Sequence, residues 1–100
     1  ADMAHVGLKF GDNDSVNDET LGMIRERDLA SLAFGENMDA EGFYRSIESE
    51  KDWRKICGLS PIYAALSTTG AKRGVLLDYD QALEPDTGSV VSYASMGFYL

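Results

Sequence analysis

The chain contains little cysteine, little histidine and little proline. Its 100 residues include one cysteine, one histidine and two prolines. A single cysteine excludes an internal disulfide framework, so the fold must rely on its hydrophobic core. The lack of bridges favours a reducing compartment but leaves both a cytoplasmic and a secreted location open. The start at Ala1 in place of methionine fits removal of an initiator methionine or cleavage from a precursor.

Positive charge and long apolar runs are also scarce. The chain has 9 lysines and arginines against 17 aspartates and glutamates, a formal net charge of −8. This negative charge repels the phosphate groups of nucleic acids, so we expect no direct binding to DNA or RNA. No apolar run approaches the ~20 residues of a membrane-spanning helix. Because 44% of the residues are hydrophobic, we expect one folded domain over residues 1–100, with the oligomeric state left open.

The N-terminal part predicts one strand followed by one helix. His5 to Phe10 alternates apolar and other residues, which is the period of a half-buried strand. Ser15 and Asp18 have the spacing of a capping box and predict a helix that starts near Val16 and closes at Phe34–Gly35. The charged run 25–28 interrupts the apolar arc of this helix. It indicates either a break or a charged notch on the buried side.

The segment Asp39 to Gly58 predicts one long second helix. Asp39 can cap its first turn, and Gly58 is placed as a terminal glycine. The apolar stripe rotates between the two halves of this segment, so the helix either breaks near Ser46 to Ser49 or covers two surfaces. Its second half carries Trp53 and Arg54, together with most of the basic residues of the segment. We expect that half to be a docking place for an acidic partner.

The last forty residues are rich in strand and turn residues. The predicted fold is α+β, with two helices packed on one face of a mostly antiparallel four-stranded sheet in the order β-α-α-β-β-β. The first strand is expected inside this sheet. The C-terminal elements are expected as two hairpin strands, a loop and a final strand, at Ile62 to Thr68, Gly74 to Tyr79, Gln81 to Ser89 and Val90 to Leu100.

Asp78 and Asp80 are weak candidate metal ligands. A D-x-D pair after a hydrophobic strand can hold a divalent cation, because alternate strand residues point to the same side. With Val75, Leu77 and Tyr79 in the core, the two carboxylates would simply face water, and we favour that interpretation. No cofactor is indicated by any motif of the chain.

Lys72 and Arg73 form a basic pair at the expected hairpin tip, in an otherwise acidic protein. Such a pair can bind phosphate, carboxylate or an acidic groove, although charges at hairpin tips are common. In the final strand, alternation sends Met96 and Phe98 one way and Tyr93 and Tyr99 the other. One face is core, and the tyrosine face is a candidate partner or oligomer surface.

Cys57 and His5 are the remaining reactive side chains. Cys57 would lie at a helix C-terminus, where the dipole opposes a thiolate, so we expect a packed and inert thiol. His5 has no acid or nucleophile nearby in sequence, and a Cys57–His5 dyad is disfavoured.

The absence of a catalytic constellation favours a non-enzymatic function. The leading hypothesis is a small acidic binding protein of the inhibitor, immunity or anti-defence type, whose partner is another protein or a cell-surface component. The alternative is a secreted effector or killer-type cytotoxin acting at a cell surface or membrane. The third hypothesis is a small metal-dependent enzyme that uses Asp78 and Asp80.

Overall fold

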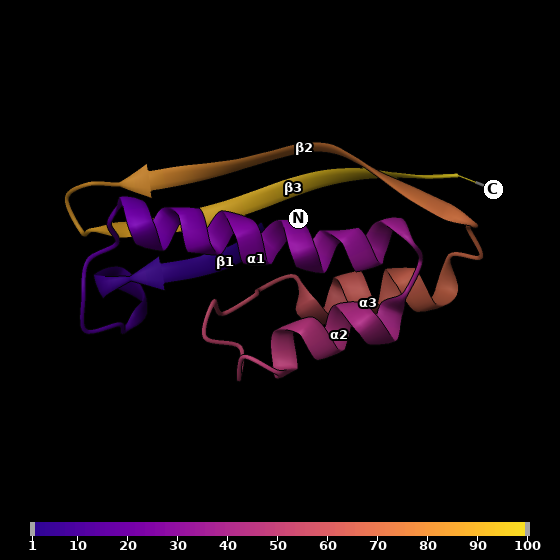
Figure 1. Ribbon diagram of the computed structural model, residues 1–100, viewed down its shortest axis with the longest axis horizontal. Coiled ribbons are helices and arrows are strands. Elements are labelled where there is room, and N and C mark those ends of the chain that lie inside the picture. The colour runs from indigo at the N-terminus through magenta and orange to yellow at the C-terminus, as the bar shows by residue number, and fades with distance from the viewer. Residues whose placement is uncertain (1, 100) are drawn as a thin grey trace.

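The computed structural model describes residues 2–99 as an α+β fold of three helices and one three-stranded antiparallel sheet (Figure 1). Leu100, expected at the end of the last strand, lies outside the described residues. None of the described helices is long and apolar enough to cross a membrane. In chain order the elements are β1 (Asp2–Gly7), a short 3-10 helix (Leu8–Phe10), α1 (Asp18–Glu36), α2 (Ala40–Glu48), α3 (Leu59–Thr68), β2 (Arg73–Glu84) and β3 (Ser89–Tyr99).

The sheet has the strand order β1-β3-β2, with both pairs antiparallel. The expected fourth strand is absent from the described residues, and β1 lies at an edge instead of inside the sheet. The central strand is β3, which pairs with β2 along its whole length and with β1 only as far as Tyr93. From Ser95 onward, β3 pairs only with β2 within residues 2–99.

Strand β1 begins and ends earlier than the alternation predicted. It stops at Gly7, whose φ of 126° ends the extended run, and Leu8 in the following 3-10 helix is 49% exposed. The Gly7 N–H donates to the Asp12 carboxylate at 2.8 Å, and Lys55 Nζ lies 2.8 Å from the same oxygen. Burial opposes ionisation of Asp12, but these two partners hold its pKa below the usual value.

Helix α1 is continuous through the charged run that could have broken it. Its N-cap is Asn17, whose side chain accepts the Thr20 N–H at 2.8 Å, so the capping box expected at Ser15 does not form. Asp28 points inward and is fully buried. The charged notch, one of the two expected alternatives, is therefore the one that forms.

Of the two alternatives for the segment Asp39 to Gly58, the break near Ser46 to Ser49 is the one that forms, because α2 ends at Glu48; a single helix over the whole segment is wrong. Asp39 caps it as expected, through the Gly42 N–H at 2.9 Å. Beyond Ser49 the chain enters the left-handed region at Lys51, Asp52 and Lys55, which a continuous helix cannot accommodate. This turn directs the Arg54 side chain inward.

The C-terminal half contains a helix that was not expected, and its β-hairpin is longer than expected. Ile62 to Thr68, predicted as a strand, belongs to α3, which begins after Gly58 and carries Pro61 in its first turn. Most of the expected loop Gln81 to Ser89 is strand. Strand β2 runs to Glu84, and a tight turn over residues 85–88 leads directly into β3.

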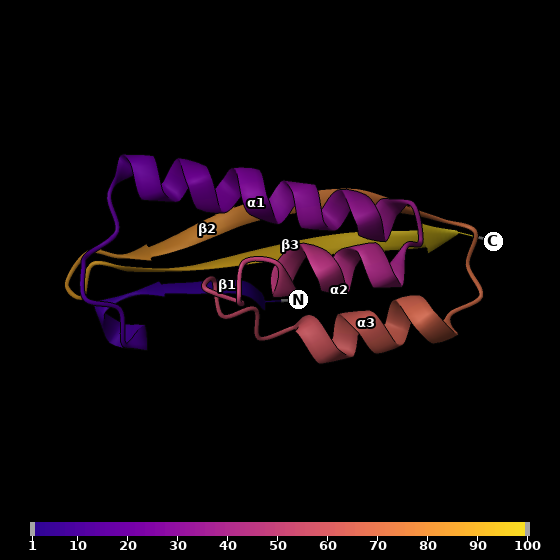
Figure 2. The same ribbon diagram turned by 60° about the horizontal axis from the view of Figure 1, so that its bottom comes forward.

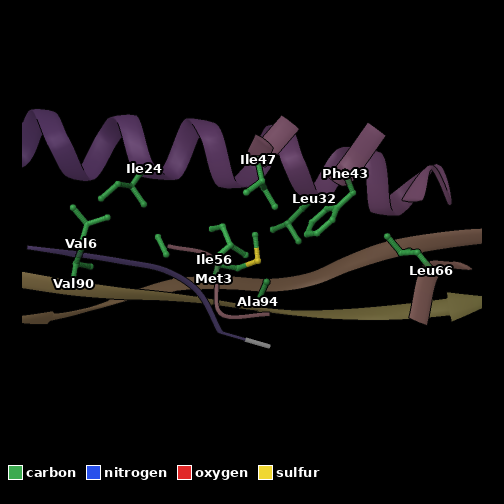
Figure 3. Packing of buried hydrophobic residues seen from close by; sticks show 11 residues of the cluster. Met3, Val6, Ile24, Leu32, Phe43, Ile47, Ile56, Leu66, Val90 and Ala94 are labelled. Atoms are coloured by element: carbon green, nitrogen blue, oxygen red, sulfur yellow. The ribbon is translucent and has the colours of Figure 1, made fainter. Parts of the chain in front are cut away.

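The helices are stacked beside one another along the sheet (Figure 2). Helix α1 contacts β1 and β2, α2 packs on α1, and α3 packs on α2. The core fills the space between these helices and the sheet, as Figure 3 shows. Its fully buried members include Met3, Ile24, Phe43 and Ile47.

Candidate functional site

The open sheet face is the surface of β2 and β3 that points away from the core, and it is defined here by Val75, Leu77, Asp78, Asp80, Tyr93 and Tyr99. Register pairs Asp80 with Tyr93, and alternate residues of an antiparallel pair share a face. Leu77 is 60% exposed, Tyr99 50% and Tyr93 40%. The tyrosine face expected from the alternation of β3 thus exists, opposite to Met96.

A β-bulge in β2 creates part of this face. The register shifts between Leu76 and Asp78, which leaves Leu77 without a partner on β3. The expectation that Val75, Leu77 and Tyr79 share the core face is therefore wrong. Leu76 and Tyr79 pack against the core, and the bulge turns Leu77 outward.

Asp78 and Asp80 are exposed, and their carboxylates bind backbone N–H groups of their own strand. Asp78 accepts the Tyr79 N–H at 2.9 Å, and Asp80 accepts the Gln81 N–H at 2.8 Å. Asp80 Oδ2 also lies 3.4 Å from Tyr93 Oη. The negative charge of Asp80 is the main cause that raises the pKa of Tyr93.

These carboxylates cap the strand edge and form no three-ligand metal site. Glu36 adds a third example, because its side chain accepts the Leu76 N–H at 3.0 Å. Carboxylates along β2 discourage pairing with another strand. Within residues 2–99, no group of three or more His, Cys, Asp or Glu side chains is placed to hold a metal ion.

Lys72, Arg73 and Tyr99 meet at one end of the open sheet face. The Lys72 N–H donates to the Tyr99 carbonyl at 2.9 Å, and the Arg73 guanidinium lies 5.8 Å from the centre of the Tyr99 ring. Both basic residues are exposed. They lie in the connection from α3 and at the start of β2, so the expected position at a β-hairpin tip is wrong.

Arg54 is fully buried and cannot serve as the surface docking residue expected for it. Its guanidinium donates to Asp28 at 2.7 Å, to Glu50 at 2.9 Å and to Ser31 at 3.0 Å. Trp53 is half-buried and packs against the core. The sequence around Arg54 predicts an exposed helix, because it does not reveal the main partner, Asp28, which lies 26 residues away.

Asp28 is the centre of this buried network. Besides Arg54, it accepts the hydroxyls of Tyr79 at 2.6 Å and of Ser92 at 2.5 Å. Ser92 also accepts the Ala4 N–H at 2.7 Å. Burial and the bond to Asp28 raise the pKa of Tyr79 well above its usual value. The network joins α1, the segment after α2 and all three strands. Its signals in the sequence are the acid on the apolar arc of α1 and the four-residue spacing of Glu50 and Arg54, which form an ion pair.

His5 and Cys57 lie along the outer edge of β1. The segment after α2 runs beside β1, with bonds from the His5 N–H to the Arg54 carbonyl at 2.7 Å and from the Cys57 N–H to the Met3 carbonyl at 3.3 Å. The His5 ring lies edge-on to Phe10. Cys57 is exposed, so the expectation of a packed thiol is wrong.

Two sequence matches relate this chain to known proteins. A family model described as "Memo: Memo-like protein" matches residues 1–97. The MEMO1 family protein of Aquifex aeolicus (strain VF5) is 37% identical over 101 residues, which cover 98% of this chain and 25% of the relative. The chain thus spans about a quarter of the length of the curated relative it matches.

These matches overturn the functional hypotheses drawn from composition. Neither match describes an inhibitor, an immunity or anti-defence protein, a secreted effector or a toxin. The family match extends over nearly the whole chain and depends on no single motif. A search for catalytic motifs could therefore not have identified the family. The chain belongs to the Memo family.

Proposed function

We propose that this chain acts by packing its open sheet face against another polypeptide and that it catalyses no reaction of its own. The partner is the remainder of a Memo-family polypeptide. The observation that carries this proposal is the exposure of Leu77, Tyr93 and Tyr99 on one side of the sheet. A relative four times as long as the matched region contains ample chain to cover that side.

The chemistry of the open sheet face suits a protein partner. Burying a leucine or an aromatic side chain contributes ~1.5–3 kcal/mol, so the exposed side chains offer a favourable contact. Tyrosine is enriched in such contacts because its ring is apolar while its hydroxyl can still form a hydrogen bond. Asp80 and Arg73 lie at separate positions of the face and can orient the partner through opposite charges. Net negative charge disfavours a nucleic acid as the alternative partner.

The proposal of a non-catalytic role is supported by the way polar groups are used. Asp28, Arg54, Ser31 and Ser92 are buried and bonded to one another, and no buried side-chain nitrogen or oxygen of the described residues lacks a partner. On the open sheet face, Asp78 and Asp80 are bonded to the backbone. These groups stabilise the fold and leave no activated nucleophile or base among them.

A binding experiment with a matched variant tests this function. The Aquifex MEMO1 family protein, lacking the quarter that this chain matches, is titrated into the chain by calorimetry. We expect binding that Leu77→Asp weakens at least tenfold, because the aspartate would be buried without a partner. Met23→Asp is the control, since Met23 is 45% exposed but lies on α1.

The opposite result would reject the open sheet face as the contact surface. Equal weakening by both variants, or weakening by Met23→Asp alone, would place the contact elsewhere. Absence of binding at about 100 µM would reject the proposed partner. Self-association of the free chain that Leu77→Asp abolishes would instead make a second copy the occupant.

A further inference from the structure

An apolar cleft lies between α3 and the second half of β3. Its volume is about 320 Å³, and it begins where β1 stops pairing with β3. Figures 1 and 2 show that β1 runs along only one half of β3, while α3 lies toward the other end of that strand. The side chains that line it include Leu32, Ile62, Ala65, Ala94, Met96 and Phe98. The cleft is therefore a gap in the sheet edge with an apolar floor.

The other two sheet edges are protected against pairing. Along β1, the segment after α2 supplies three backbone hydrogen bonds, to residues 2, 3 and 5. Along β2, carboxylates of Glu36, Asp78 and Asp80 accept edge N–H groups. Both devices prevent another strand from adding to the sheet.

The edge of β3 from Ser95 to Phe98 has neither device. Within residues 2–99, the backbone hydrogen bonds of this stretch go to β2. No carboxylate of the described residues caps it. A strand edge with unpaired backbone groups beside an apolar cleft is the arrangement used by proteins that accept an added strand.

We propose that this edge accepts one extended strand of a Memo-family polypeptide, antiparallel to β3 and in line with β1, with alternate side chains in the cleft. The occupant is a strand and not a small apolar ligand, because a small ligand would fill the cleft but leave the backbone of Ser95 to Phe98 unpaired. The strand continues the register of β1. Because Asp2 lies opposite Tyr93, five residues of the added strand in the same register reach the position opposite Phe98.

The register also fixes which side chains of the added strand enter the cleft. Paired residues share a face, and Met96 and Phe98 line the cleft. The residues opposite these two therefore point into it, about 7 Å apart at ~3.3 Å per residue. They should be apolar, while the residue between them faces the open sheet face and can be polar.

This inference rests on the proposed function only for the origin of its partner, because the two surfaces are distinct. The first experiment adds six residues before Ala1, with valines opposite Met96 and Phe98 and threonines elsewhere. An extension of glycine and serine is the matched control. Hydrogen exchange of the edge-facing amides of Ser95 to Phe98 is followed by NMR. We expect exchange at least tenfold slower with the valine extension only.

Two substitutions on α3 test whether the cleft receives the side chains. Ala65→Trp fills the cleft and should remove the slowed exchange, whereas the control Ala64→Trp, at an exposed neighbouring position, should not. Leu77→Asp should leave the slowed exchange unchanged. Failure of the open sheet face as a contact surface can thus be told apart from failure of this inference.

The second experiment tests the natural occupant with the shortened Aquifex polypeptide described above. We expect it to slow the same amides of Ser95 to Phe98. Equal exchange with the valine and glycine extensions would overturn the inference. So would an effect of the Aquifex polypeptide confined to other amides, or concentration-dependent slowing in the chain alone, which would identify a second copy as the occupant.

Discussion

Replacing Asp28 by alanine should remove a large part of the stability of this protein. The Asp28 carboxylate accepts three hydrogen bonds, from Arg54, Tyr79 and Ser92, at 2.5–2.7 Å. Both members of the Asp28–Arg54 ion pair are fully buried. Without Asp28, the guanidinium keeps Glu50 as its only anionic partner among the described residues.

The magnitude follows from the cost of an uncompensated buried charge. Removing one member of a buried ion pair costs ~3–5 kcal/mol. The total stability of a protein of this size is about 5–15 kcal/mol. We therefore expect Asp28→Ala to be only marginally folded at 25 °C. The hydroxyls of Tyr79 and Ser92 also lose their acceptor, which adds to this effect.

Urea unfolding followed by far-ultraviolet circular dichroism measures this loss. With an m-value of about 2 kcal/mol/M, a loss of ~4 kcal/mol lowers the midpoint by about 2 M. Asp86→Ala is the control, because it removes the same charge from an exposed position in the β2–β3 turn. The double variant with Arg54→Met should lose less than the sum of the single variants. Additive losses, or an Asp28→Ala midpoint equal to that of the control, would refute the role of Asp28.

Two further predictions concern Gly7 and Tyr79. Gly7→Ala should cost at least ~2 kcal/mol, because φ is 126° and the new Cβ would lie 2.4 Å from the Ser89 Cα. Gly22→Ala, at an open position near the start of α1, should instead stabilise the protein by ~0.5–1 kcal/mol. Urea midpoints that shift in the same direction for both variants would contradict this. Tyr79 has a raised pKa in the folded state, so its contribution is complete below the unfolded pKa near 10 and is lost as the pH rises above it. Tyr79→Phe should therefore flatten the fall in stability above about pH 10. An unchanged slope in urea titrations would argue against it.

Local signals in the sequence were sufficient for the start of α2 and for one face of the sheet. Asp39 caps α2 as expected, because an N-cap depends only on the residues of the first turn. The separation of Tyr93 and Tyr99 from Met96 and Phe98 also formed as predicted, since alternation is a property of the strand itself. These features needed no knowledge of distant contacts.

The remaining features depend on tertiary contacts or on competing local preferences. Ile62 to Thr68 has strand-forming composition, but Pro61 in the first turn and the four-residue spacing of Ile62 and Leu66 suit a helix packed on α2. The bulge at Leu77 reversed the alternation that placed it in the core. Arg54 was assigned to the surface because nothing near it in the sequence reveals its bond to Asp28.

The central position of β3 sets the order in which this protein can fold during synthesis. Among the described residues, β1 and β2 each pair only with β3, and β3 follows both of them in the sequence. While the ribosome is still translating the residues before Ser89, neither strand has its partner, and the apolar side chains of Met3 and Val6 remain exposed to solvent. Closing a loop of more than eighty residues, from Asp2 to Tyr93, then makes the pairing of β1 with β3 slower than the formation of the β2–β3 hairpin. A nascent chain halted before Ser89 should consequently lack the sheet that residues 2–99 form and should be a target for chaperones.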